Sequence, residues 1–175
     1  MPHIPVPAAE LNTRLDRLRC AMTEKDPAWS MLLLDNTLDM YYFTGTMQDG
    51  ALVVTPDQAT LFVRRSFDVA KDESAFADIR PMGSFRGIKE VYPYIPETVY
   101  VAAKTMTLQK LSMLNKHLPF APKPMDGVLS ALRSVKSAYE LDCMRESGKL
   151  HRYVIEGLAP AFLREIGRAS CRERV

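Results

Sequence analysis

Two adjacent arginines, Arg64 and Arg65, are the side chains of this sequence best suited to bind a charged ligand. They follow the β-rich segment ATLFV, so we expect them at the end of a strand. A guanidinium group presents parallel N–H donors that match the two oxygens of a carboxylate, which makes a substrate carboxylate the expected ligand. The alternative is a solvated strand end that forms ion pairs with Asp68 or Glu73. Arg64 and Arg65 are therefore candidate substrate-binding residues.

The other reactive side chains form no recognisable catalytic set. His3, His117 and His151 are isolated, because no His, Cys or carboxylate lies at a metal-ligand spacing from them. We expect His151 on the polar face of a helix or at an interface. Cys20 and Cys143 are expected as small core residues of helices, since no basic partner is placed to form a thiolate. The sequence thus predicts neither a catalytic residue nor a metal site in this chain.

Acidic, glycine and aromatic residues near the middle of the chain also favour structural roles. Asp35 and Asp39 resemble a carboxylate pair, but Asp is common where a strand ends and caps the next turn. Gly45 and Gly50 are expected in backbone turns, because no lysine-bearing glycine loop accompanies them, and nucleotide binding is not supported. Three aromatic residues are consecutive, Tyr41, Tyr42 and Phe43. They either line a ligand site together with the arginines or close the core, which is the commoner role at a strand-to-turn junction.

The ten C-terminal residues, IGRASCRERV, differ from the rest of the chain. They have no apolar periodicity and resemble one translated frame of a common sequencing-library adapter, so we treat residues 166–175 as a non-native tail. The alternative is a short, basic and frayed C-terminus. The tail holds three of the 23 basic and one of the 21 acidic residues, which leaves 20 of each in residues 1–165. This balance predicts no nucleic-acid partner and no anionic membrane partner.

The remaining composition indicates a globular protein of the cytoplasm. Hydrophobic residues make up 47% of the chain, enough for a core. No apolar run reaches the roughly 18 residues that a membrane-spanning helix needs. The N-terminus MPHIPVPAAEL lacks the basic start and the apolar centre of a signal peptide. Cys20 and Cys143 lie far apart and suggest no extracellular disulfide framework.

Helices and strands alternate along the segments that must position the arginines. Apolar residues recur at helical spacing in residues 8–22, with Arg14 among the charged residues on the other faces, and Asp26-Pro27 ends that helix. Pro56-Asp57-Gln58 predicts a hairpin turn between two strands. Pro122 and Pro124 restrict any strand that contains them to a sheet edge. Strands are predicted over 29–34, 51–55, 59–63, 78–82 and 98–102, and further helices over 66–75, 108–118 and 126–135. This order predicts an α/β fold, a three-layer α/β/α arrangement with a mixed sheet.

A long amphipathic helix is predicted after residue 137. Ser137 and Glu140 have the spacing of a capping box, in which each side chain accepts from the backbone N–H of the other residue. Pro160 is expected to kink or end this helix. A helix with such an apolar stripe needs a partner surface, and no segment after it supplies one. The stripe comprises Leu141, Met144, Leu150, Val154 and Leu158.

The order of several short segments resembles the creatinase, prolidase and aminopeptidase P family. The segments LDRLRCAM, SMLLLDN, DMYYFTG, GALVV and ATLFV follow the N-terminal domain of that family, and LRSVKSAYELDCMRESGKLHRYVIEGLAPAF resembles its junction with the catalytic domain. The resemblance covers residues 8–164. It implies a creatinase/prolidase-type N-terminal domain in residues 1–135, then a hinge and the first helix of a truncated pita-bread domain in residues 136–165.

The resemblance also implies a function for the parent protein. In this family two Asp, one His and two Glu of the pita-bread domain bind two divalent metal ions (Mn, Co or Zn), which activate water for hydrolysis of Xaa-Pro peptides. None of these ligand motifs is present, so we expect the chain itself to be inactive. The family's N-terminal domain supports a homodimer and lends residues to the rim of a partner's active site, where Arg64 and Arg65 would lie. The alternative is a non-catalytic binding or dimerisation module.

Overall fold

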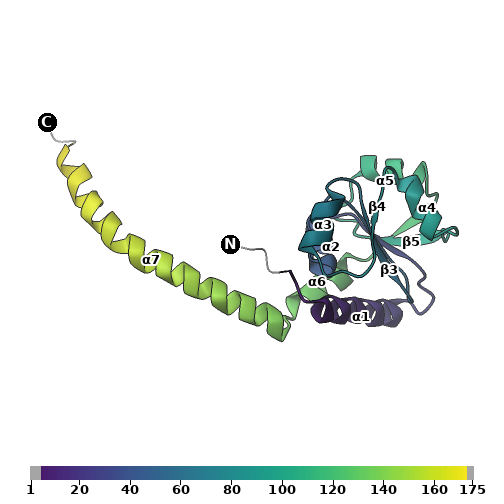
Figure 1. Ribbon diagram of the computed structural model, residues 1–175, viewed down its shortest axis with the longest axis horizontal. Helices are drawn as coiled ribbons and strands as arrows, with labels where there is room; N and C mark the ends of the chain where they lie inside the picture. The colour runs from purple at the N-terminus through teal and green to yellow at the C-terminus, as the bar shows by residue number, and fades with distance from the viewer. Residues whose placement is uncertain (1–4, 173–175) are drawn as a thin grey trace. The chain divides into compact units, whose positions relative to one another are not determined.

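The computed structural model describes the backbone of residues 5–172, and the side chains of residues 5–125 and 127–158 (Figure 1). The chain divides into two compact units, residues 1–134 and residues 135–175. The first unit alternates helices and strands, and the second is a single helix. The elements are α1 (Ala8–Lys25), β1 (Leu32–Leu34), α2 (Thr37–Thr44), β2 (Gly50–Val54), β3 (Ala59–Val63), α3 (Phe67–Glu73), β4 (Ile79–Pro81), the 3₁₀ helix η1 (Phe85–Gly87), α4 (Ile88–Val91), β5 (Thr98–Val101), α5 (Leu108–Asn115), β6 (Ala121–Pro124), α6 (Asp126–Ser134) and α7 (Ala138–Arg172).

Six strands form one mixed sheet in the order β4-β3-β2-β1-β5-β6. Strand β2 runs antiparallel to both neighbours, with Leu33 opposite Val53 on one side and Leu61 opposite Leu52 on the other. The pairs β1–β5, β3–β4 and β5–β6 are parallel. Strands β1, β3, β4, β5 and β6 therefore share one direction, so that their carboxyl ends lie at the same edge of the sheet.

Helices cover both faces of this sheet and complete a three-layer α/β/α fold (Figure 1). One face packs against η1, α4 and α5, where Leu33, Val53 and Phe62 meet Ile88 and Leu114 in a single apolar cluster. Because side chains alternate along a strand, the neighbouring residues of β1, β2 and β3 face the other layer. In that layer α1 packs against α2 and α6. The predicted fold class is confirmed.

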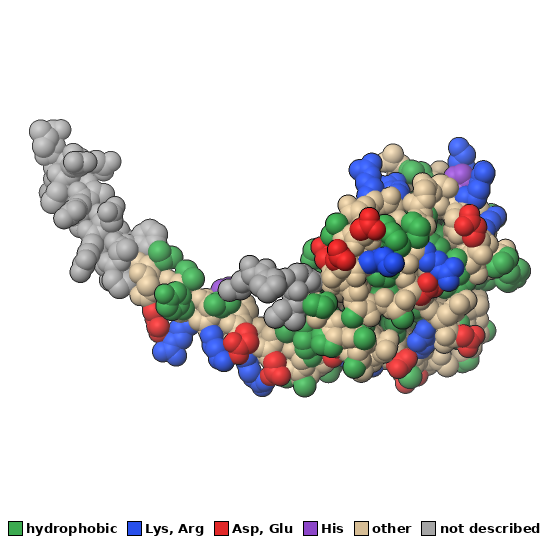
Figure 2. Space-filling view, in the orientation of Figure 1, with side chains coloured by type: hydrophobic (Ala, Val, Ile, Leu, Met, Phe, Trp, Pro, Cys, Tyr) green, Lys and Arg blue, Asp and Glu red, His purple; other side chains and the backbone are tan. Residues whose placement is uncertain are grey.

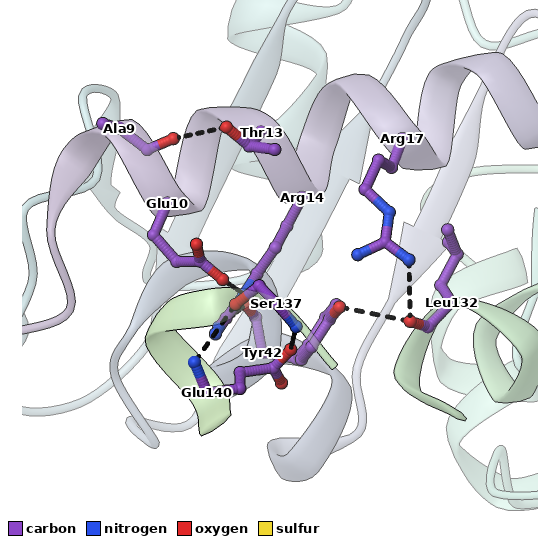
Figure 3. Close-up of polar contacts among 9 residues, drawn as sticks. All are labelled: Ala9, Glu10, Thr13, Arg14, Arg17, Tyr42, Leu132, Ser137 and Glu140. Carbon is purple, nitrogen blue, oxygen red and sulfur yellow. Dashed lines mark hydrogen bonds and ion pairs between the residues drawn. The ribbon is translucent and has the colours of Figure 1, made fainter. Parts of the chain in front are cut away.

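Arg14 is a buried residue of α1, although we expected it on a polar face. Only 5% of its side chain is exposed. Figure 3 shows Arg14 on α1 beside Tyr42 of α2: its Nε donates to Glu10 Oε1 at 2.8 Å and its Nη1 donates to the Tyr42 carbonyl at 2.7 Å. Its guanidinium also lies 4.4 Å from the centre of the Tyr42 ring. Neighbouring Arg17 is only half-buried, and its Nη2 donates to the Leu132 carbonyl at 3.3 Å.

The end of α1 is tied to the sheet by Asp26, where the helix stops as predicted. Asp26 Oδ2 accepts from Lys123 Nζ at 2.9 Å and from the Tyr100 hydroxyl at 2.7 Å, while Oδ1 accepts from the Ala28 N–H at 3.1 Å. These hydrogen bonds, led by the one from Lys123, lower the pKa of Asp26 to about 2. One carboxylate thus joins α1 to the parallel strands β5 and β6.

Several predicted elements are confirmed, but α2, η1 and α4 were not predicted. The hairpin turn falls between β2 and β3, where the Thr55 N–H donates to the Gln58 carbonyl at 2.8 Å. Strand β6 contains Pro122 and Pro124 and is an edge strand. The segment 37–44, for which we predicted no secondary structure, is α2. Its buried side chains are not confined to one stripe, so apolar periodicity could not identify it.

The second unit begins with the predicted capping box. The Ser137 N–H donates to Glu140 Oε2 at 2.9 Å, and the Glu140 N–H donates to Ser137 Oγ at 3.1 Å. The apolar side chains along α7 are exposed, as in Leu150 and Val154 at 60% and 51%. Of the kink or end expected at Pro160, the end is wrong, because the helix continues to Arg172. Residues 1–4 and 173–175 lie outside the described part of the chain. No helix within residues 5–172 is long and apolar enough to cross a membrane.

Candidate functional site

Arg64 leaves the carboxyl end of β3 and is fixed there by one residue, Asp49. The Arg64 N–H donates to the Asp49 carbonyl at 2.8 Å. Its Nε and Nη2 both donate to Asp49 Oδ2, at 2.9 Å and 2.5 Å. The two side chains are 40% and 42% exposed. The alternative interpretation, an ion pair of Arg64 with Asp68 or Glu73, is therefore wrong: Glu73 Oε2 instead accepts from the Thr46 hydroxyl at 2.8 Å.

Arg65 is exposed and precedes a sharp turn of the backbone. Ser66, the next residue, has φ 57° and ψ 46° and is the only residue other than glycine with a positive φ in the described part of the chain. The left-handed conformation costs an L-residue roughly 1 kcal/mol. This turn redirects the chain from β3 into α3. The structure thus places Arg64 and Arg65 at one sheet edge but gives only Arg64 an ion pair among the described residues.

At the opposite, amino ends of β3 and β4, hydrogen bonds tie these two strands together. The Thr60 hydroxyl donates to Asp78 Oδ2 at 2.7 Å and lies 3.1 Å from the Tyr92 hydroxyl. Burial alone would raise the pKa of Asp78, but hydrogen bonds from Arg80 and Thr60 outweigh it and lower that pKa. Burial raises the pKa of Tyr92. Asp78 is therefore held as a carboxylate and Tyr92 as a neutral phenol, which fits a structural network.

A cavity of about 260 Å³ opens beside Arg64. Three segments far apart in sequence form it: the exit of β3, residues 82–85 after β4, and the C-terminal end of α5. His117 belongs to this cavity, so the isolated histidine predicted from sequence does contribute to a pocket. The lining residues are Arg64, Met82, Gly83, Ser84, Phe85, Met113, Lys116 and His117. Sequence spacing gave no signal for this convergence.

The acidic residues after β1 are buried ion-pair partners, not caps. Asp35 Oδ2 lies 3.0 Å from Lys110 Nζ, and its side chain is 3% exposed. Asp39 Oδ1 lies 2.9 Å from Arg133 Nη1, and its side chain is 5% exposed. Asn36 caps α2 instead, accepting from the Leu38 N–H at 2.8 Å. The capping role predicted for Asp35 and Asp39 is wrong, because each carboxylate is paired with a cation from a distant helix.

The aromatic and glycine predictions hold in part. Tyr42 and Phe43 are buried on α2 and pack edge to face at 5.0 Å, so they close the core and do not line a rim. Tyr41 on the same helix is half-buried. Gly45 ends α2 with φ 76°, a conformation that favours glycine. At Gly50 an added Cβ would lie 1.9 Å from a carbonyl oxygen of β3, which explains the glycine by close strand approach and not by a turn.

The cysteines and the remaining histidines do not form a site. Cys20 and Cys143 are free and exposed, so the expected core positions are wrong. His151 is an exposed residue of α7. His3 lies outside the described residues. Within the described residues, no three His, Cys, Asp or Glu side chains are arranged to hold a metal ion.

The family of the chain follows from its sequence match. The family described as Creatinase/Prolidase N-terminal domain matches residues 14–135, which include every strand of the sheet and both candidate arginines. The chain belongs to this family. No curated protein sequence is significantly similar to it.

Solved structures of Xaa-Pro peptidases share the fold. The Xaa-Pro dipeptidase from Bacillus anthracis has a TM-score of 0.73 at 18% identity, over 86% of this chain and 43% of that protein. The prolidase from Pyrococcus furiosus has a TM-score of 0.62 at 25% identity, over 73% of this chain and 40% of that protein. The Creatinase/Prolidase N-terminal domain of an X-Pro dipeptidase from Streptococcus pyogenes is covered over 98% of its length, with a TM-score of 0.57 at 18% identity. This chain thus spans less than half of the length of the proteins from Bacillus anthracis and Pyrococcus furiosus.

Proposed function

We propose that this chain is the non-catalytic N-terminal domain of an Xaa-Pro aminopeptidase- or dipeptidase-like metallopeptidase of the cytoplasm. The family match over residues 14–135 carries the proposal. The similarity to the prolidase from Pyrococcus furiosus, at 25% identity, supports the peptidase class. In this proposal the substrate is a proline-containing peptide, and hydrolysis belongs to a domain that the sequence does not contain.

The described residues of this chain do not fit a two-metal centre. Such a centre needs several carboxylate and imidazole ligands around two ions, and the described residues offer no group of three. We therefore assign the two divalent ions (Mn, Co or Zn) to the catalytic domain of the parent protein. The role left to this domain is to support a homodimer and to shape the rim of the active site.

Arg65 is the better placed of the two candidate arginines for a substrate carboxylate at that rim. Arg64 already donates two hydrogen bonds to Asp49, so its guanidinium is committed. Arg65 is exposed, and its backbone is oriented by the left-handed Ser66 that follows. An exposed guanidinium retains its full set of donors for a carboxylate. Arg64 would then act as a positioning residue that fixes the strand exit.

The proposal is tested by the DNA of the source locus beyond the codon of Arg164. The expected result is an open reading frame that continues for about one further domain. That domain should contain two Asp, one His and two Glu in this order as metal ligands. The extended protein, purified with Mn²⁺, should cleave an Xaa-Pro dipeptide, whereas the present chain should not. A frame that encodes IGRASCRERV and then stops would overturn the proposal and favour a stand-alone binding or dimerisation module.

A further inference from the structure

The cavity beside Arg64 has an apolar floor. Met82 and Phe85 line it although they are only 3% and 7% exposed, so the little surface they present faces a hollow. Met113 lines it from α5 and is 47% exposed, which leaves about half of an adaptable thioether residue available for contact. Methionine packs against ligands of varied shape because its side chain is unbranched and polarizable. The floor suits the apolar part of a small molecule.

The rim of the cavity is basic. Arg64, Lys116 and His117 line it, and none of its lining residues is acidic. Arg64 is paired with Asp49, but no carboxylate among the described residues lies within ion-pair distance of Lys116 or His117. Figure 2 shows basic side chains gathered with a histidine over the α5 end of the domain. An anion in the cavity would therefore accept hydrogen bonds from N–H donors, and no acidic lining residue would repel it.

Gly83 lines the cavity without a side chain. A Cβ added at this position would meet no atom within 4 Å, and its φ lies outside the range that disfavours L-residues. Packing and backbone conformation therefore do not require glycine here, in contrast with Gly50. A larger side chain at residue 83 would extend into open space beside Ser84 and Phe85, which line the same cavity. The position offers a way to fill the cavity without changing any charge.

From these observations we propose that the cavity binds a small organic anion. Its carboxylate accepts hydrogen bonds from Lys116 Nζ and the His117 ring N–H, and its apolar body packs on the floor formed by Met82, Phe85 and Met113. A volume of about 260 Å³ limits the ligand to the size of a small aromatic or aliphatic acid. Binding would use both the charge and the apolar body, so neither a bare anion nor a neutral analogue should replace the ligand.

This site does not depend on the proposed peptidase role. All its lining residues belong to the first unit, so it is complete in the present chain without a catalytic domain. The variants chosen to test it leave Arg64 and Arg65 unchanged. A failed binding experiment would therefore say nothing against the peptidase assignment, and a frame that stops after residue 175 would say nothing against the cavity.

The test is an NMR titration of the ¹⁵N-labelled full chain with phenylacetate. We expect saturable shifts of the backbone amides of residues 83–85 and 116–117. Phenylacetamide, which has the same shape without the charge, should bind about tenfold more weakly, since a hydrogen bond to a charged group contributes about 1.4 kcal/mol or more. Inorganic phosphate, which has charge without an apolar body, should give no saturable shift at the same concentrations.

Matched variants show whether the cavity is the binding site. Gly83→Leu should weaken phenylacetate binding at least about tenfold by filling the cavity, and Lys116→Gln should weaken it about tenfold by removing the charge. Lys89→Gln, which removes an exposed lysine outside the cavity, should stay within about twofold of the wild type. The proposal is overturned if wild type shows no saturable shift, if phosphate or phenylacetamide matches phenylacetate, or if Lys116→Gln binds as well as wild type. Wild-type affinity in a folded Gly83→Leu variant would also overturn it.

Discussion

Two arginines in this domain show how the same side chain serves two purposes. Arg14 lies between α1 and α2, is 5% exposed, and donates to both the Glu10 carboxylate and the Tyr42 carbonyl. Arg64 lies at the exit of β3, is 40% exposed, and donates to the Asp49 carboxylate beside an open cavity. Removing the partner of the buried Arg14 guanidinium would destabilise the fold. Water can replace Asp49 as the partner of the exposed Arg64 at little cost in free energy. Burial, more than residue type or ion pairing, therefore decides how much each arginine contributes to the stability of the fold.

The largest effect is expected from Arg14→Met, which keeps the apolar stem but removes the charge. Glu10, only 12% exposed, would lose its 2.8 Å ion pair with Arg14, and the Tyr42 carbonyl would lose a hydrogen bond. Breaking a buried pair by removing one partner costs about 3 kcal/mol. Urea unfolding followed by circular dichroism should show this loss in the free energy of unfolding.

Arg17→Met is the matched control for Arg14→Met on the same helix. Arg17 is half-buried and makes a single 3.3 Å hydrogen bond to the Leu132 carbonyl, so its removal should cost less than about 1 kcal/mol. Equal losses in the two variants would show that burial does not distinguish these arginines, and the comparison would fail.

Asp26 is intermediate in exposure between Arg14 and Arg64, and the contribution of its ion pair to stability can be tested by changing the pH. Its side chain is 25% exposed, and its pKa is lowered from 3.8 to about 2 by Lys123, Tyr100 and the Ala28 N–H. A lowered carboxyl pKa stabilises the fold fully above the unfolded-state pKa, and the contribution is lost as pH falls from 3.8 toward 2. Asp26→Asn should therefore be less stable than wild type at neutral pH, with a difference smaller than for Arg14→Met.

The measurement for Asp26 is the urea midpoint of wild type and Asp26→Asn at several pH values and low salt. The two midpoints should converge as pH falls through the window from 3.8 to about 2. Because the site is near the surface, added salt should reduce the difference at neutral pH. A difference that is constant with pH would mean that the carboxylate charge is not what joins α1 to the sheet.

The sequence predicted those parts of the fold that depend on local patterns. Helical spacing located α1, turn residues located the β2–β3 hairpin, and two prolines placed β6 at an edge. It failed for Arg14, which occupies the apolar face of α1 between Leu11 and Leu18. Its spacing from those leucines, with Glu10 four residues before it, was a signal for a buried ion pair. Charge alone was a poor guide to exposure.

The candidate site could be predicted only where it is local. The position of Arg64 and Arg65 at the end of β3 followed from the strand pattern before them. The partner Asp49 could not be chosen over Asp68 or Glu73, because strand register decides which carboxylate lies opposite Arg64. The cavity joins residues from β3, the segment after β4 and the end of α5, and only the packing of α5 on the sheet brings them together. Long-range packing therefore carried the missing information.

The smallest effect on stability is expected at the candidate site itself. Arg64→Ala should lower the free energy of unfolding by less than about 1 kcal/mol, because its ion pair with Asp49 is exposed at both ends. Arg65→Ala should change it by less than about 0.5 kcal/mol, since Arg65 is exposed and makes no ion pair among the described residues. Both are measured by urea unfolding beside Arg14→Met. A loss from Arg65→Ala as large as that from Arg14→Met would make Arg65 a structural residue. Arg65 would then not be available for a substrate carboxylate. The contrast between the buried site of Arg14 and the exposed end of β3 would also no longer hold.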